Sequence, residues 1–267
     1  MLLGEPPATK YDFNFQIAGV PVRVHPYFWL AGLILGSHGD SLELLVWIAA
    51  LFVSILIHEL GHSMMMRRFG ISSHIVLHMM GGLAIPDSSG FGGRNNNARS
   101  WILIAFAGPA AGFVFASLIV VAIKASGGIF QVQPRFPIFW EFALNEPPSL
   151  EGPSPLVMMV GTLLYINIFW GLLNLVPVYP LDGGQIARHV FTEFDPGQGV
   201  IKSLWLSVFA GGALAAMALM SSGSLFMTLM FGMLAYQSYT AIQQSGGGGF
   251  GGGYGGGYGS GRGGRPW

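Results

Sequence analysis

Two histidines and a glutamate in this chain are spaced so that they can form a zinc site. Residues 58–62 read His-Glu-Leu-Gly-His. On a helix, His58 and His62 lie at i and i+4, one turn apart on the same face. Two imidazoles placed in this way can bind one Zn²⁺, and Glu59 beside them can take a proton from a bound water. The spacing therefore predicts His58 and His62 as metal ligands and Glu59 as a general base.

The motif lies at the end of an apolar run that is long enough to enter a membrane. Apolar residues extend from Leu42 through Ile57, interrupted only by Glu43 and Ser54. Ionisable groups at membrane depth are rare, cost free energy and usually serve a function. A hydrolytic zinc site in this setting indicates peptide hydrolysis within the membrane.

Composition supports an integral membrane protein. The 267 residues are 52% hydrophobic and 9% charged, and the formal net charge is zero. The apolar residues fall in long blocks, and nothing in the charge suggests a nucleic-acid partner. The chain has no cysteine, so a metal site has to use histidines and carboxylates. No cleavable signal peptide is evident, and the first apolar segment is interpreted as a retained span.

The apolar segments predict an all-α integral membrane bundle of about six transmembrane helices, because a span needs roughly 20 apolar residues. The segments are 26–37, 42–69, 100–125, 155–178, 203–220 and 224–242. With both termini cytoplasmic, ten Lys and Arg residues lie inside and only Lys124 and Arg135 outside, as the positive-inside rule requires. We therefore expect a cytoplasmic N-terminal segment (1–25), a six-span domain (26–244) and a disordered Gly-rich tail (245–267).

Two connecting segments have their own patterns. Between the second and third spans, Ile71, Ser73, Ile75, Leu77 and Met79 fall on alternate positions, which would share one face of a strand, and Gly81-Gly82 follows. This predicts a strand or hairpin with a glycine bend, and the strand at 75–79 could pair with an unwound substrate. The segment 125–155 is rich in proline and aromatic residues, and we expect an irregular external loop or a segment on the membrane surface.

A third zinc ligand can come from the end of the fourth span. There the chain reads Asn174-Leu-Val-Pro177-Val-Tyr-Pro180-Leu-Asp182-Gly-Gly, and the two prolines interrupt a helix. Irregular backbone at membrane depth is tolerated where it lines a cavity or is covered by protein. The predicted topology puts Asp182 at the same depth as His58 and His62. Asp182 is thus a candidate third ligand, although a plain turn residue is the alternative.

Together these motifs resemble the site-2 protease family of intramembrane zinc metalloproteases, in the compact form without a PDZ domain. That family carries H-E-x-x-H in one span and N-x-x-P-x-x-x-L-D-G in a later one; this chain has HELGH and NLVPVYPLDG. Residues 19–26 and 81–84 also resemble the start and the membrane-associated β-hairpin of such proteins. The resemblance covers roughly residues 13–244. One departure is Gly112, where many members have asparagine.

The resemblance implies a role for each motif residue. His58, His62 and Asp182 would bind Zn²⁺, Glu59 would be the catalytic base, and Asn174 would bind substrate. The expected partners are a transmembrane protein substrate and the lipid bilayer, with no nucleic acid. The expected location is the cytoplasmic membrane of a prokaryote. The natural substrate and the oligomeric state stay open.

Three other functions are compatible with parts of this pattern. A metal-ion transporter could use the same ligands, but spans three, five and six carry no carboxylate or histidine. An inactive relative could bind membrane proteins, although all four key residues are present. Other membrane proteases with H-E-x-x-H take a downstream glutamate as third ligand, for which this chain offers no downstream glutamate on a predicted span.

Asn167, seven residues before Asn174, is either an interhelical hydrogen-bond partner or a substrate contact.

Overall fold

The structure is a computed structural model, and it describes residues 5–36, 41–87, 97–127, 129–135, 139–145, 155–221 and 225–246. In these ranges five helices are long and apolar enough to cross a membrane. They are α2 (Ser41–Arg68), α3 (Ala98–Ala125), α4 (Pro155–Asn174), α6 (Gly199–Ser221) and α7 (Leu225–Gly246). The protein is therefore an integral membrane protein. The predicted tail from residue 247 onward lies outside the described ranges.

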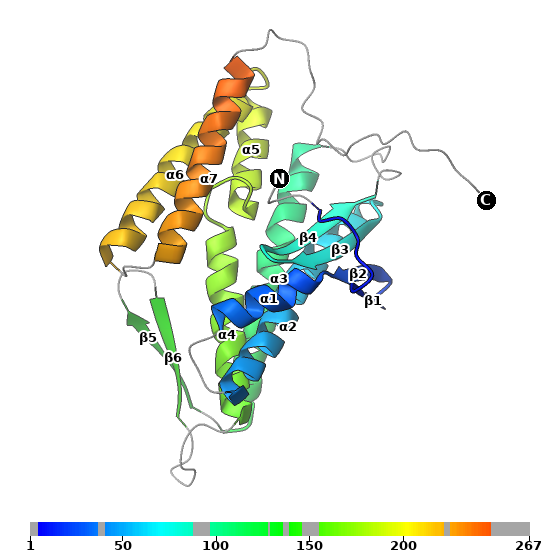
Figure 1. Ribbon diagram of the computed structural model, residues 1–267, viewed down its shortest axis with the longest axis vertical. Helices are drawn as coiled ribbons and strands as arrows, with labels where there is room; N and C mark the ends of the chain where they lie inside the picture. The colour runs from blue at the N-terminus through cyan, green and yellow to red at the C-terminus, as the bar shows by residue number, and fades with distance from the viewer. Residues whose placement is uncertain are drawn as a thin grey trace, which may run out of the picture.

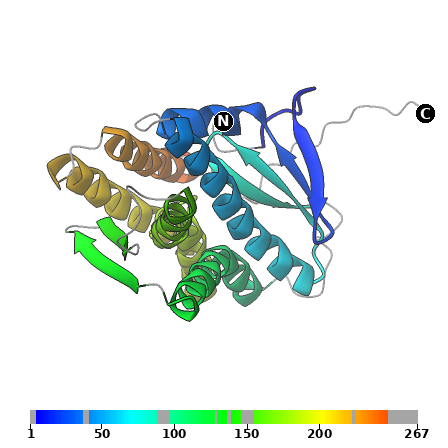
Figure 2. The same cartoon turned by 90° about the horizontal axis from the view of Figure 1, so that it is seen from below.

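The spanning helix α2 is at the centre of the bundle. Within the protein, 44% of its span is buried, compared with 17% for α7. It packs against α3, α4 and a four-stranded sheet. Figures 1 and 2 show this sheet on one side of the helices and the α6–α7 pair on the other. The helix with the zinc motif therefore has protein around it, whereas α6 and α7 leave most of their apolar surface to lipid.

The sheet has the order β1-β2-β3-β4, with strands Phe13–Ile17, Val20–Val24, Ser73–His78 and Gly81–Pro86. Neighbouring strands are antiparallel except β2 and β3, which are parallel. One face places Val24 and Leu77, both fully buried, in the same core cluster as Leu51 and Ile55 of α2. The predicted hairpin is thus two strands of a larger sheet.

The turn of this hairpin differs from the prediction. Met79 and Met80 form it, whereas Gly81 and Gly82 begin β4. Gly81 has a φ of +118°, a backbone conformation that side chains disfavour. Gly82 is needed for a different reason, because it lies against Glu59.

The predicted first span is a short helix, α1 (Pro26–Leu35). Its ten residues rise about 15 Å, half the hydrocarbon thickness. It lies along α2 with Gly32 beside Leu51 and Gly36 beside Trp47. Five helices rather than six therefore reach spanning length in the described ranges. The residues just before α1 pair with β3, so they form a strand and not a further helical turn.

The fourth span ends earlier than predicted, at Asn174, and the chain then runs irregularly to a helix absent from the prediction, α5 (Asp182–Phe194). Pro177 and Pro180 have no backbone N–H, which explains the break. α5 has one apolar and one polar face, and this periodicity in 182–194 could have revealed it. The segment between α3 and α4, expected as an irregular loop, contains two antiparallel strands, β5 (Ile129–Arg135) and β6 (Phe139–Asn145), and is more regular than expected.

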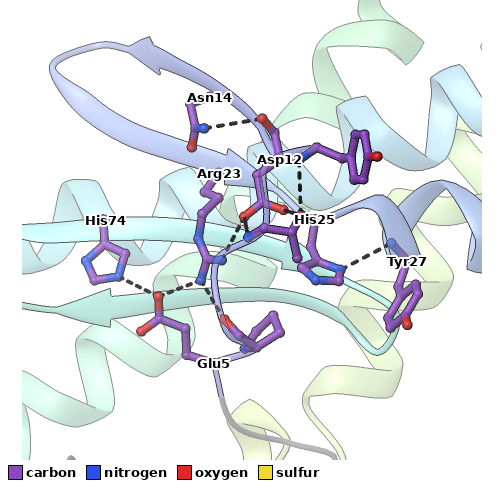
Figure 3. Close-up of polar contacts among 10 residues, drawn as sticks. Glu5, Asp12, Asn14, Arg23, His25, Tyr27 and His74 are labelled. Atoms are coloured by element: carbon purple, nitrogen blue, oxygen red, sulfur yellow. Dashed lines mark hydrogen bonds and ion pairs between the residues drawn. The ribbon is translucent and has the colours of Figure 1, made fainter. Parts of the chain in front are cut away.

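Residues 5–12 lie against the sheet through charged contacts (Figure 3). The Arg23 guanidinium on β2 donates to Asp12 at 3.0 Å and to Glu5 at 2.6 Å. Glu5 also lies 3.6 Å from His74 on β3. Because β1 and β2 pair with β3, residues 13–24 belong to the same packed unit as α2.

Candidate metal centre and catalytic site

His58 and His62 of α2 meet Asp182, the first residue of α5. Their candidate ligand atoms all lie within 4.8 Å of one another, and all three residues are buried. The Nε2 atoms of the two histidines are 3.1 Å apart. Asp182 lies 3.1 Å from His58 Nε2 through Oδ2 and 3.4 Å from His62 Nε2 through Oδ1. The two halves of the sequence pattern thus come together, although 120 residues separate them.

The chemistry of this cluster fits a bound cation. His62 Nδ1 lies 2.7 Å from the carbonyl oxygen of Ile104 on α3. That acceptor fixes the proton on Nδ1, so in the neutral ring Nε2 has a free lone pair. Asp182 Oδ2 is buried without hydrogen-bond geometry to any described donor. Two imidazoles and one carboxylate form a donor set typical of catalytic Zn²⁺.

Glycines allow α3 to approach the metal centre closely. A Cβ on Gly108 would lie 2.2 Å from His62 Nε2, and one on Gly61 would lie 2.3 Å from the Ala107 carbonyl oxygen. Any side chain at either position would force the helices apart or displace the imidazole. The close approach places Ile104 within reach of His62. Neither Gly108 nor the Ile104 carbonyl was identified from the sequence as part of the site.

Glu59 faces strand β4. Its side chain is buried, and its carboxylate lies toward the backbone N–H of Ala84. A Cβ on Gly82 would lie 2.6 Å from Glu59 Oε1. The strand therefore holds the carboxylate beside the two histidines. Sequence reasoning missed both contacts, since they join segments that are more than 20 residues apart.

The position of β4 corrects the expected substrate strand. β3, which includes residues 75–78, is paired on one side with β2 and on the other with β4. It has no free edge for another peptide. Among the described strands of this sheet, β1 and β4 are the edges. The Ala84 N–H reaches Glu59, so the backbone groups of Ala84 and of Gly82, two residues away, point away from β3.

The two asparagines of α4 have different surroundings. Asn167 donates through Nδ2 to Ser54 Oγ and to the Leu163 carbonyl, each at 2.8 Å. It therefore links α4 to α2, which supports the interhelical interpretation. Asn174 is buried at the end of α4, and in the described part of the chain its amide makes no hydrogen bond. It thus has donors and an acceptor available.

The remaining described histidines lie outside the metal cluster. His25 and His78 accept through Nδ1 from the backbone N–H two residues later. His74 contacts Asp87 at 3.0 Å, and His189 stacks on Trp101. His38 lies outside the described residues. Each of these described histidines has a local partner outside the metal cluster, which is consistent with a structural role.

Comparison with known proteins gives a consistent picture. The model of peptidase family M50 matches residues 46–217. "Zinc metalloprotease MJ0392" of Methanocaldococcus jannaschii is 26% identical over 86% of this chain and 59% of its own length. "Putative zinc metalloprotease sll0528" of Synechocystis is 27% identical over 84% and 57%, and "Putative zinc metalloprotease Rip3" of Mycobacterium tuberculosis is 28% identical over 65% and 42%. The chain thus spans less than two thirds of each of these relatives.

A solved structure has a similar fold. The "Site-2 Protease from Methanocaldococcus jannaschii" aligns with 87% of this chain and 95% of its own, with a TM-score of 0.52 and 24% sequence identity. The resemblance noted in the sequence thus extends to the arrangement of the helices and the sheet.

Proposed function

Because this chain belongs to peptidase family M50, we propose that it is an intramembrane zinc metalloprotease that hydrolyses peptide bonds in or near transmembrane segments. The proposal rests on one observation: His58, His62 and Asp182 form a buried cluster beside Glu59, in a chain with five helices of spanning length. A soluble protease would have no need to keep such a site between apolar helices.

His58, His62 and Asp182 would hold Zn²⁺. When bound, the metal supplies Lewis acidity and lowers the pKa of water to about 7. Glu59 accepts the proton of the attacking water and passes it to the leaving amine. The Ala84 N–H keeps the Glu59 carboxylate in place, and the Ile104 carbonyl keeps the His62 ring oriented.

Substrate would lie along the free edge of β4. A transmembrane helix hides its carbonyls in its own hydrogen bonds, so it has to unwind before cleavage. The outward backbone groups of Gly82 and the Ala84 carbonyl can pair with the unwound peptide, while the Ala84 N–H faces Glu59. This pairing would place the substrate carbonyl beside Glu59. The free amide of Asn174 can bind a second backbone group of the substrate. Its burial near the end of α4 supports this role.

We further propose that β2 and α1 together complete a sixth crossing. Arg67 at the end of α2 donates to the Ala18 carbonyl at 2.9 Å, and Gly36 lies against Leu44 near the start of α2. The segment 18–36 thus accompanies α2 along most of its length in the opposite direction. This supports a topology with both termini cytoplasmic, in the cytoplasmic membrane of a prokaryote, with the positive charges inside.

The transporter alternative has little support. Neither α3, α6 nor α7 contributes a carboxylate or histidine within the described ranges, so these helices offer no further ligand of that kind along an ion path. The three relatives above are all described as zinc metalloproteases. An inactive relative would not need Glu59 to be held against the ligands.

The test is cleavage of single-span model substrates in reconstituted membranes. Wild type is expected to cleave, and both a chelator and Glu59→Gln are expected to abolish cleavage. Glu59→Gln should keep the fold and the bound zinc, because the amide has nearly the same shape. Cleavage retained in Glu59→Gln would contradict the assigned base, and cleavage that survives zinc removal would contradict the proposed function.

A further inference from the structure

The buried serines of α6 and α7 differ in where their hydroxyls bond. Ser203 donates to the Val200 carbonyl, Ser207 to the Ser203 carbonyl and Ser238 to the Leu234 carbonyl, all within their own helices. Ser207 makes one more bond: its Oγ accepts from the backbone N–H of Tyr179 at 3.0 Å. Ser207 is 1% exposed. Among these three serines it is the one that reaches the segment leading to Asp182.

That segment is folded tightly against the first turn of α5. A Cβ on Gly183 would lie 2.1 Å from the Leu175 carbonyl oxygen, and one on Gly184 would lie 2.4 Å from Tyr179 N. The Tyr179 amide therefore touches the helix that begins with Asp182. These close contacts leave no space between Tyr179 and the first turn of α5. A displacement of Tyr179 would therefore also displace the start of α5.

An apolar contact fixes the same segment from the side of α7. Val178 is fully buried and packs in one cluster with Phe231 and Leu234. This apolar contact holds the segment against the helix pair, but it is not directional and does not fix how the backbone groups point. The Ser207 hydrogen bond does fix the direction of the Tyr179 amide, because it supplies one acceptor at one position.

We propose that Ser207 is a positioning residue for the metal ligand Asp182, and that α6 thereby determines metal affinity without supplying a ligand. The inference rests on the proposed function of His58, His62 and Asp182 as zinc ligands. Without the hydroxyl, the N–H of the half-buried Tyr179 loses its acceptor and has to move to find another, and the Asp182 carboxylate moves with it. Groups that orient metal ligands change affinity by about 10- to 100-fold when they are removed.

The experiment measures zinc affinity of the full-length protein in detergent by competition with a chromophoric chelator, together with the absorption spectrum of the Co²⁺ form. Ser207→Ala is expected to bind zinc about tenfold more weakly and to alter the Co²⁺ spectrum. Ser207→Thr keeps the oxygen and should bind as wild type does. Should the added methyl prevent folding, Ser207→Cys, with a poorer acceptor of similar size, should weaken binding in the same direction as Ser207→Ala.

Ser238→Ala is the matched control, since it removes an equally buried hydroxyl that bonds only within its own helix. It should leave zinc affinity unchanged. If Ser207→Ala binds zinc as tightly as wild type, or if Ser238→Ala loses as much zinc affinity as Ser207→Ala does, the positioning role of Ser207 is overturned. Either result would leave the proposed function standing. Failure of the wild-type protein to bind zinc would instead overturn the proposed function, and this inference with it.

Discussion

At the residue scale, two glycines leave the space that the functional side chains of the site occupy. Gly108 faces His62, and Gly82 faces Glu59. One glycine thus gives room to a metal ligand and the other to the base. This separation lets metal binding and proton transfer be tested independently, each by a single added methyl group.

Gly108→Ala should remove the metal. Its Cβ would lie 2.2 Å from His62 Nε2, too close for the imidazole to keep its place beside α3. We expect zinc content to fall and peptide cleavage to drop by about 10- to 100-fold, as for the loss of a ligand's support. Metal analysis of the purified protein tests this. Gly212→Ala on α6, where a Cβ meets nothing within 4 Å, should behave as wild type. Full zinc content in Gly108→Ala would contradict the close approach of α3.

Gly82→Ala should leave the metal bound and slow the reaction. The added methyl would overlap the Glu59 side chain and push the carboxylate from its position, and the three atoms nearest to it all belong to Glu59 rather than to a metal ligand. General-base catalysis contributes about 10²- to 10⁴-fold, so kcat should fall within that range. Single-turnover cleavage with a zinc assay on the same sample measures both effects. A loss of zinc equal to that in Gly108→Ala would show that the two glycines do not act separately.

At the element scale, a buried polar contact joins α4 to the helix that carries the zinc motif. Asn167 of α4 donates to Ser54 of α2, one turn before His58. Both residues are buried. In an apolar setting such a bond joins two helices without contributing to the chemistry, and it sets how α4 stands relative to the zinc helix.

Asn167→Ala and Ser54→Ala should therefore lower stability and show coupling. In membrane proteins, interhelical hydrogen bonds of this kind contribute about 0.6 kcal/mol on average and at most about 1.7. A double-mutant cycle of unfolding in mixed detergent measures the coupling energy. Ser117→Ala provides the control, because that hydroxyl bonds only within α3. Purely additive effects of the two substitutions would contradict a direct bond between α2 and α4.

At the scale of the whole molecule, the metal centre lies between two supports. The four-stranded sheet holds Glu59 from one side, and the α6–α7 pair holds the segment before Asp182 from the other (Figures 1 and 2). The sheet is itself covered by residues 5–12 through Arg23 (Figure 3). Contacts at the N-terminal edge can thus affect the stability of the support for Glu59.

The contribution of Asp12 to stability should depend on pH. Burial raises the pKa of the Asp12 carboxyl, but hydrogen bonds from Thr9 and Arg23 outweigh it and lower the pKa to about 2. Because the folded-state pKa lies below the unfolded value, the stabilisation is complete above that unfolded value and is lost as the pH falls toward 2. It is at most about 2 kcal/mol. Asp12→Asn should lower the Tm near pH 6, and the difference from wild type should shrink by pH 3. A difference that stays constant with pH would contradict the ion pair.

The sequence by itself determined the features that depend on neighbouring residues. The i, i+4 spacing of His58 and His62 and five of the six apolar runs follow from local geometry and hydropathy, and the structure agrees with them. The helix break before Asp182 is also local, although α4 ends at Asn174, before the first proline. The amphipathic pattern of residues 182–194 is also a local feature of the sequence. The irregular segment with two prolines directly before it made the start of this helix hard to recognise. Asp182 could be named as a candidate ligand, because a carboxylate at a broken helix end stands out.

Only the tertiary structure decided which segments meet. The parallel pairing of β2 with β3 joins residues about 50 positions apart, so the residues just before the first predicted span form a strand, and the span itself is a helix of only ten residues. The contacts of Gly82 with Glu59, Gly108 with His62 and Ser207 with Tyr179 likewise join distant segments. Periodicity cannot reveal these contacts, because it reports which face of an element is apolar and not which element covers that face.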